Sequence, residues 1–343
     1  LSISSGSLTF SNASVFNSSL SLSGGSFVAD GNAAIGGFTM TGGLVGGNGT
    51  VTLLGSAAIS GGSLSSGGGF ITAGNTSVTN TVSVDRDWTN TGNLALSGGM
   101  ISLINGGRTY TNTGTTTITT SSNTPWNVNG GAAIVNSGQM VFNGGVSANP
   151  GNPLTNAASG TITVASGDLV AAASFGQFGN LVLAGGNVTA TAGLTNNGTI
   201  SGTGTINGGA STLTNAGVVS PGGAGNVGVL SVVGHYAQTP AGTLAIDIPS
   251  AGSRDVLSVS GNATLAGTLA ANVGYVPGTF DKHVFLVTAA NGITGSFGIV
   301  SGTGNLPLTI RAAQGQALLG FTGKTWDSGG GANTSWQLAT NWD

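Results

Sequence analysis

The sequence contains no cysteine and no glutamate, and it carries very little charge of either sign. Of its 343 residues, 6 are basic and 9 are acidic, so charged residues make up 4% of the chain, against roughly 25% in an average soluble domain. Without cysteine there is no disulfide framework and no thiolate metal site. Six cations at a formal net charge of −3 cannot neutralise a track of phosphates, which excludes a nucleic-acid-binding protein.

Helix-forming residues are also scarce, whereas glycine is abundant. Glycine accounts for 65 residues and proline for only 8. Glycine costs about 1 kcal/mol at each interior helix position, so a helical protein is excluded. The glycines follow no three-residue period, which excludes collagen. Apolar residues make up 39% of the chain, which is enough to bury a core and argues against disorder.

Two short motifs recur along the chain. The first is asparagine, a small residue and glycine, and its asparagines recur about every 20 residues, with one interval twice as long. They are Asn90, Asn112, Asn136, Asn196 and Asn215, with a variant at Asn156. We expect them to form a ladder of amides that caps backbone groups at corners. The second motif is Gly-Gly at the end of short strands, at residues 24–25, 42–43, 61–62, 98–99 and 185–186.

Short runs of β-branched and small polar residues lie between these motifs, for example at 161–164 and 181–183. Two or three such strands with glycine or asparagine corners make one coil of a solenoid. The sequence therefore predicts an all-β fold, a right-handed parallel β-solenoid with irregular coils of about 20 residues. The alternative is a large antiparallel sandwich or barrel, but its turn signals would recur about every 8–12 residues.

One pair of coils aligns residue by residue and suggests a binding site. When residues 85–92 are placed over residues 107–114, Arg86 falls on Arg108 and Trp88 falls on Tyr110. Two aromatic rings beside two guanidinium groups predict a glycan-binding strip, with a purely structural packing stack as the alternative.

Asp85 and Asp87 stand two positions apart in a strand and so point to one face. They are weak candidates for a calcium site or for the paired carboxylates of a glycosidase. The neighbouring coil has only Gly107 and Thr109 at the matching positions. His235 and His283 are the only imidazoles, and no nucleophile-elbow pattern surrounds any serine. We therefore expect no catalytic residue, no cofactor and no metal, and a protein that is not an enzyme.

The C-terminal third contains a longer pattern. It begins with Ser-Pro-Gly at 220–222 and continues with Gly-Thr-Leu at 242–244, Ser-Arg-Asp at 253–255 and Gly-Thr-Leu at 267–269. In order and spacing it resembles the end of an autotransporter passenger, although Arg254 and Asp255 stand in the reverse of the commoner order. The resemblance implies a right-handed β-helix, secretion and a role at the cell surface of a Gram-negative bacterium. The tail, with Trp326, Trp336 and Trp342, resembles the Trp-rich start of the autotransporter-associated β-strand repeats of large bacterial surface proteins.

These observations divide the chain into irregular solenoid coils at 1–212, a passenger-like segment at 213–320 and the start of a Trp-rich module at 321–343. We expect a secreted structural and adhesive rod or fibre segment at the bacterial surface or in the extracellular matrix. The expected partners are other copies of the chain or adjoining modules, and glycans, with no nucleic acid and no insertion into a membrane. Two alternatives remain open: a polysaccharide-degrading β-helix enzyme and a passive spacer stalk of a giant adhesin.

Overall fold

The computed structural model describes residues 1–65, 67–128, 131–145, 147–149, 153–171, 175–250, 252–275, 283–302, 308–311 and 314–320. The Trp-rich segment expected at 321–343, with Trp326, Trp336 and Trp342, lies outside the described residues.

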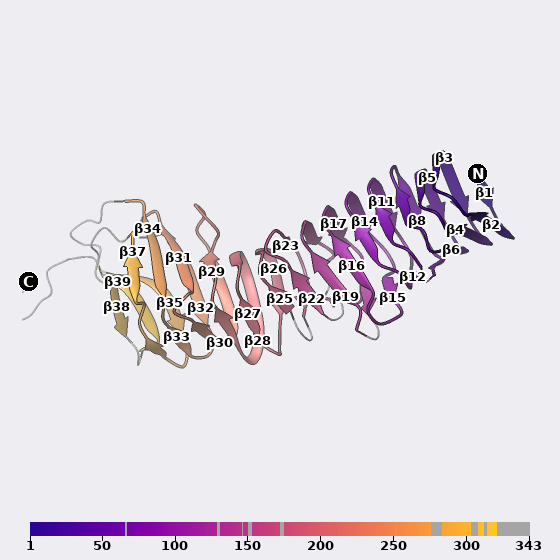
Figure 1. Ribbon diagram of the computed structural model, residues 1–343. Coiled ribbons are helices and arrows are strands. Elements are labelled where there is room, and N and C mark those ends of the chain that lie inside the picture. Colours follow the sequence, from indigo (N-terminus) through magenta and orange to yellow (C-terminus); the bar gives the residue numbers. More distant parts are fainter. Residues whose placement is uncertain are drawn as a thin grey trace, which may run out of the picture.

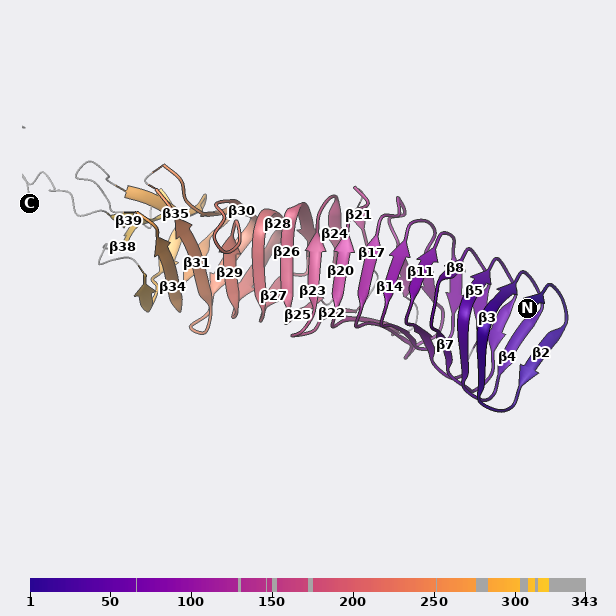
Figure 2. The same cartoon turned by 90° about the horizontal axis from the view of Figure 1, so that it is seen from above.

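The described chain is a rod of stacked β-coils, with β1 near one end and β38 and β39 near the other (Figure 1). Seen from above, the rod bends in its N-terminal third (Figure 2). The described residues contain no α-helix, and nearly all neighbouring strands pair in parallel. The prediction of an all-β parallel solenoid is therefore confirmed, and the antiparallel sandwich or barrel is wrong.

Most strands are short, as the spacing of the corner motifs requires. In the first third they are β1 (Ser2–Ile3), β2 (Ser7–Phe10), β3 (Ser14–Leu22), β4 (Ser26–Ala29), β5 (Ala33–Met40), β6 (Leu44–Gly46), β7 (Val51–Leu53), β8 (Ala57–Ile59), β9 (Ser63–Leu64), β10 (Phe70–Thr72), β11 (Asn75–Val78), β12 (Val82–Val84), β13 (Trp88–Asn90) and β14 (Asn93–Leu96). In the middle they are β15 (Ile101–Leu103), β16 (Thr109–Asn112), β17 (Thr115–Ile118), β18 (Trp126–Val128), β19 (Ala133–Asn136), β20 (Gln139–Phe142), β21 (Ser147–Ala148), β22 (Leu154–Asn156), β23 (Thr161–Val164), β24 (Asp168–Val170), β25 (Phe175–Gln177), β26 (Asn180–Thr189) and β27 (Leu194–Asn196). The last third holds β28 (Thr199–Asn215), β29 (Val218–Pro221), β30 (Val229–Gln238), β31 (Thr243–Ile248), β32 (Val256–Val259), β33 (Ala263–Leu265), β34 (Thr268–Val273), β35 (His283–Ala289), β36 (Ile293–Gly295), β37 (Ile299–Ser301), β38 (Leu308–Arg311) and β39 (Gln316–Gly320).

A coil in the N-terminal half has three strands, as in β12, β13 and β14, which stack on β15, β16 and β17. One side of these coils forms a separate sheet that runs from β2 through β4, β6, β9, β12 and β15 to β18. C-terminal to β18, long strands such as β26 and β28 continue around a corner of the coil. The pairing between β26 and β28 shifts register between Ala184 and Asn187. β28 crosses the expected boundary between 212 and 213, so the coils stack continuously across that position.

The C-terminal end of the rod departs from the parallel pattern. β39 pairs in antiparallel fashion with both β35 and β38. The sequence pattern contained no signal for this change of direction.

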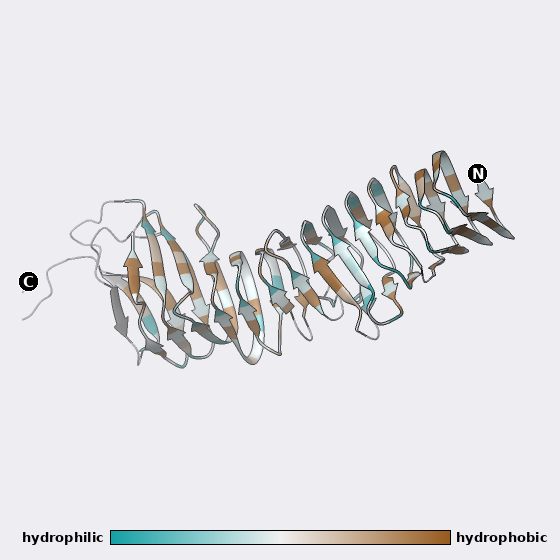
Figure 3. Ribbon diagram, viewed as in Figure 1, coloured by the Kyte–Doolittle hydropathy of each residue, from teal (hydrophilic) through white to brown (hydrophobic). Residues whose placement is uncertain are grey.

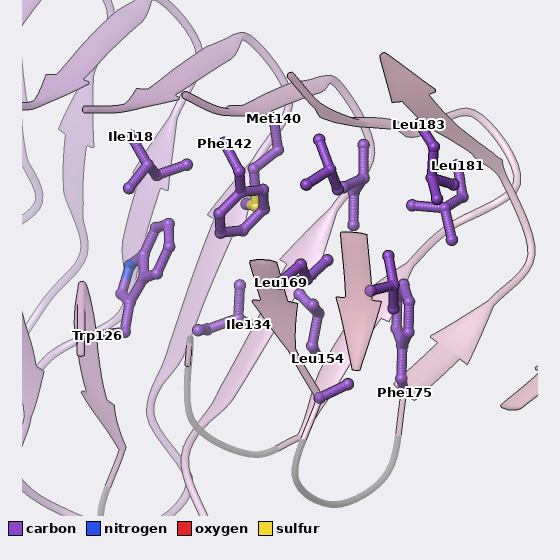
Figure 4. Packing of buried hydrophobic residues seen from close by; sticks show 14 of the residues in the cluster. Ile118, Trp126, Ile134, Met140, Phe142, Leu154, Leu169, Phe175, Leu181 and Leu183 are labelled. Atoms are coloured by element: carbon purple, nitrogen blue, oxygen red, sulfur yellow. The ribbon is translucent and has the colours of Figure 1, made fainter. Parts of the chain in front are cut away.

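The alternation of apolar and polar residues along each strand determines which side chains point into the core. Strands such as β19, β20 and β23 alternate exposed or half-exposed positions with buried ones, because successive side chains point to opposite faces of a strand. Figure 3 shows this alternation as bands of brown and teal along the strands. Inward side chains pack within a coil, as Trp126 and Phe142 do, and between successive coils, as Ile134 and Leu154 do (Figure 4).

The two glycine motifs have different physical causes. Gly43, in a Gly-Gly pair, has a φ of +78°, a left-handed conformation that favours glycine. Gly114, in an Asn-x-Gly motif, is not among the positive-φ glycines. A β-carbon at Gly114 would instead collide with the carbonyl oxygen of Gly92 in the preceding coil. The Asn-x-Gly glycines are therefore needed for the close approach of stacked backbones and not for a left-handed corner.

Candidate functional site

The recurring asparagines form one column of buried amides inside the rod. Each Nδ2 donates to the side-chain oxygen of the next coil, from Asn90 to Asn112 (2.9 Å), from Asn112 to Asn136 (2.8 Å) and from Asn136 to Asn156 (2.9 Å). Asn156 then donates to Gln177 (3.0 Å), and Asn196 donates to Asn215 (2.9 Å). All of these side chains are fully buried, so the ladder lies in the core of the rod.

The same amides also bond backbone carbonyls at the corners. Asn112 donates to the carbonyl of Gly114 (3.2 Å) and to that of Gln139 in the next coil (2.7 Å). Asn136 repeats this pattern with Gly138 (3.2 Å) and Thr161 (3.1 Å). A buried amide is stable only when its hydrogen-bonding capacity is met, and these contacts meet it. The geometry assigns the ladder a structural role.

Sequence reasoning missed two members of this column. Gln177 fills the double interval between Asn156 and Asn196, because its register aligns it with both. The signal was present, since Gln177 is followed two residues later by Gly179. Gln238 aligns with Asn215 at the far end of the column, but no glycine follows it at that spacing.

Trp88 and Tyr110 stack as the alignment predicted, but inside the core. They pair directly across β13 and β16, with ring centroids 6.1 Å apart, and both have 0% exposed surface. Trp88 Nε1 donates to Thr72 Oγ1 (3.1 Å), and the Tyr110 hydroxyl lies 2.6 Å from Thr116 Oγ1. Burial raises the pKa of Tyr110. No glycan can reach these rings, so the predicted glycan-binding strip is wrong.

Arg86 and Arg108 do not form a pair. Arg86 is fully buried, and it donates from Nε to the Ser65 carbonyl (2.8 Å) and from Nη2 to the Gly47 carbonyl (3.2 Å). Within the described residues its Nη1 has no hydrogen-bond partner. Burial lowers the pKa of Arg86, and the nearby Arg108 lowers it further. Through these two hydrogen bonds Arg86 connects the corners of two preceding coils.

Arg108 lies at the surface and faces Asp85. Its Nε is 3.0 Å from Asp85 Oδ1. A hydrogen bond from Asn105 lowers the pKa of Asp85, and Arg108 adds to this effect. Asp87 Oδ1 accepts the backbone N–H of Thr109 (2.9 Å). The two carboxylates thus face a cation and a backbone donor, an arrangement that does not suit calcium, and the described residues contain no cluster of metal-ligating side chains.

A buried carboxylate, which sequence reasoning did not single out as a site, lies in the segment 213–320. Asp255 is fully buried and accepts the backbone N–H groups of Gly228 (2.8 Å) and Asp247 (2.8 Å). Asp247 in turn accepts Gly225 N–H (2.7 Å) and Asn272 Nδ2 (2.7 Å). Together the two aspartates hold the glycine-rich loop at 222–228. Burial raises the pKa of Asp255 to about 6, against the opposing effect of its two backbone donors.

The imidazole of His235 is engaged structurally, because its Nδ1 accepts the backbone N–H of Asn262 (3.0 Å). The side chain of His283 lies outside the described residues.

An open groove runs across six neighbouring strands in the N-terminal third of the rod. It has a volume of about 950 Å³ and crosses β3, β5, β8, β11, β14 and β17, which lie side by side in Figure 1. Its polar lining includes Asn17, Ser19, Asn75, Asn93 and Thr115. None of its lining residues is charged. The groove therefore offers hydroxyl and amide groups, but no acid or base that could act on a bound molecule.

The chain matches no protein-family model, no curated protein and no solved structure. In the part of the chain that the structure describes, no helix could cross a membrane.

Proposed function

We propose that this chain is a structural and adhesive rod segment, secreted to the surface or the extracellular matrix of a Gram-negative bacterium. The main support is the continuous stack of coils held by one buried amide column. In a solenoid each coil contacts only its neighbours, so the number of stacked coils determines how long the molecule is. The register column from Ala34 to Thr294 spans about 60 Å at about 4.8 Å per strand.

The sparse charge supports the same proposal. A surface of hydroxyl and amide groups can pack against other surfaces without the cost of desolvating ions. The resemblance of residues 213–300 to an autotransporter passenger supports secretion and a surface location.

The first coil is suited to contact with another coil. Among the strands that the structure describes, β1 pairs only with β3, and β2 pairs only with β4. Val15 at this end is 67% exposed, and Phe10 and Phe16 are only partly buried. An unpaired strand edge accepts a further strand, so we propose that a coil of a second copy or of an adjoining module covers it.

Negative-stain electron microscopy of the purified chain tests the rod, which should appear as a straight or gently bent particle of roughly the calculated length. Compact or irregular particles would contradict the proposal.

Light scattering tests the end contact. Assembly of the unmodified chain should increase with concentration. Replacing Leu8 and Val15 with lysine should prevent this assembly, because the charges lie on the open edge. Val233→Lys, at a partly exposed position on β30, is the matched control and should behave like the unmodified chain. A chain that stays monomeric at high concentration would contradict assembly between copies.

A further inference from the structure

The groove across β3, β5, β8, β11, β14 and β17 has hydrogen-bonding groups that the fold itself does not use. Asn93 Nδ2 donates to Asn75 Oδ1 (3.0 Å), which leaves Asn75 Nδ2 and Asn93 Oδ1 without a partner in the described chain. The side chains of Asn17, Ser19 and Thr115 likewise make no hydrogen bond to described residues, although they line the groove.

These groups repeat at the spacing of the coils. Asn75, Asn93 and Thr115 stand in one register column, so an extended molecule along the rod axis would meet a free polar group about every 4.8 Å. A second column contains Ser77, Ala95 and Thr117 in the same register.

Several small residues lie between the polar groups of the lining. Gly36 and Gly37 on β5, Ala58 on β8 and Ala95 on β14 line the groove. Small side chains allow a ligand to lie close to the sheet. The C–H faces of a sugar ring are suited to such methyl-sized surface, while its hydroxyl groups are suited to amides and hydroxyls.

Other ligand classes fit this lining less well. A nucleic acid needs cations to neutralise phosphates, and the lining has none. A protein partner usually anchors on tryptophan, tyrosine or arginine, and none lines the groove. The backbone groups of its strands already pair within the sheet, so a peptide strand has no edge to extend.

We propose that this groove binds an extended neutral polysaccharide that lies along the rod axis. The proposal deepens the adhesive function proposed above, because it names a ligand class and a surface. It does not depend on the end contact, and imaging and scattering test the rod separately.

The test is affinity electrophoresis of the purified chain in gels that contain dextran, laminarin or xyloglucan as neutral probes, with heparin as an anionic comparison. At least one neutral polysaccharide should retard the chain, and heparin should not. The informative variant is Ala95→Glu, which places a bulky charged side chain in the groove. We expect its affinity to fall by about tenfold or more, because the carboxylate would displace hydrogen bonds between the groove and the polysaccharide.

Ala270→Glu is the matched control. Ala270 lies in the same outward register position on β34 and outside the groove, so its substitution should leave the affinity unchanged. Circular dichroism of both variants should match that of the unmodified chain, because both positions face outward. The proposal is overturned if no neutral polysaccharide binds, if heparin alone binds, or if both glutamate variants respond alike.

Discussion

Removing one amide from the ladder tests whether it holds the coils together. Asn136 accepts a hydrogen bond from Asn112 and donates to the side chain of Asn156 and to the carbonyls of Gly138 and Thr161. An Asn136→Ala substitution removes these contacts and leaves buried acceptors unpaired. At about 1 kcal/mol for each bond, with a further cost for unsatisfied buried groups, we expect a loss of about 3–5 kcal/mol in unfolding free energy.

Urea denaturation followed by circular dichroism measures this loss, and hydrogen exchange locates it. Exchange should accelerate in β19, β20, β22 and β23, the strands next to the missing amide. Asn93→Ala is the control, because Asn93 makes one side-chain hydrogen bond at the surface, and its loss should cost less than about 0.5 kcal/mol. If Asn136→Ala and Asn93→Ala have the same small effect, the ladder does not hold the coils, and the reasoning fails.

Three further predictions concern the core, the buried carboxylate and the stacked corners. Trp88→Ala should lower the unfolding free energy by about 3–5 kcal/mol, because it leaves a large cavity; thermal unfolding measures the loss, and a melting temperature like that of the unmodified chain would refute the burial of this ring. The pKa of Asp255 is about 6 in the folded state and 3.8 as its ordinary value, so the folded chain binds this proton more tightly, and the contribution of Asp255 to stability should increase as the pH falls from about 6 to about 4. Asp255→Asn should flatten the pH profile of urea denaturation in that window, and an unchanged profile would count against the assignment. Gly138→Ala should destabilise the chain strongly, because the new β-carbon would collide with the Gly114 carbonyl. Gly252→Ala should be nearly neutral, because a β-carbon there has no neighbour within 4 Å. Equal melting temperatures for the two variants would contradict the close-approach argument.

Much of the fold could be predicted because the corners repeat. The spacing of Asn112 and Asn136 reports the length of a coil, and the register of β16 and β19 follows it residue by residue. The position of the aromatic rings could also have been predicted. Trp88 stands two residues before Asn90, so both side chains point to the same face of β13, and a buried Asn90 requires a buried Trp88.

Other features depend on contacts that no local pattern reveals. Arg86 is buried and Arg108 is half exposed, although the alignment gave them equivalent positions. Arg86 reaches the carbonyls of Ser65 and Gly47 in earlier coils, whereas Arg108 follows the exposed corner at 104–107. The role of Asp255 likewise depends on the path of the loop at 222–228, which is brought to it by the stacking of β29 to β32.

The chain of amides from Asn90 to Gln177 runs in one direction, with every donor pointing toward the following coil. Each of these coils thus offers the next one an amide donor, and its own side-chain oxygen accepts the donor of the coil before it. If the gene segment that encodes one such coil were duplicated or deleted, the coils on either side would still present matching donors and acceptors. The result would be a longer or shorter rod with its hydrogen bonds intact. A coil inserted in the reverse orientation would meet the wrong partner on both sides. The ladder therefore makes the length of the rod easy to change in evolution and its polarity hard to change.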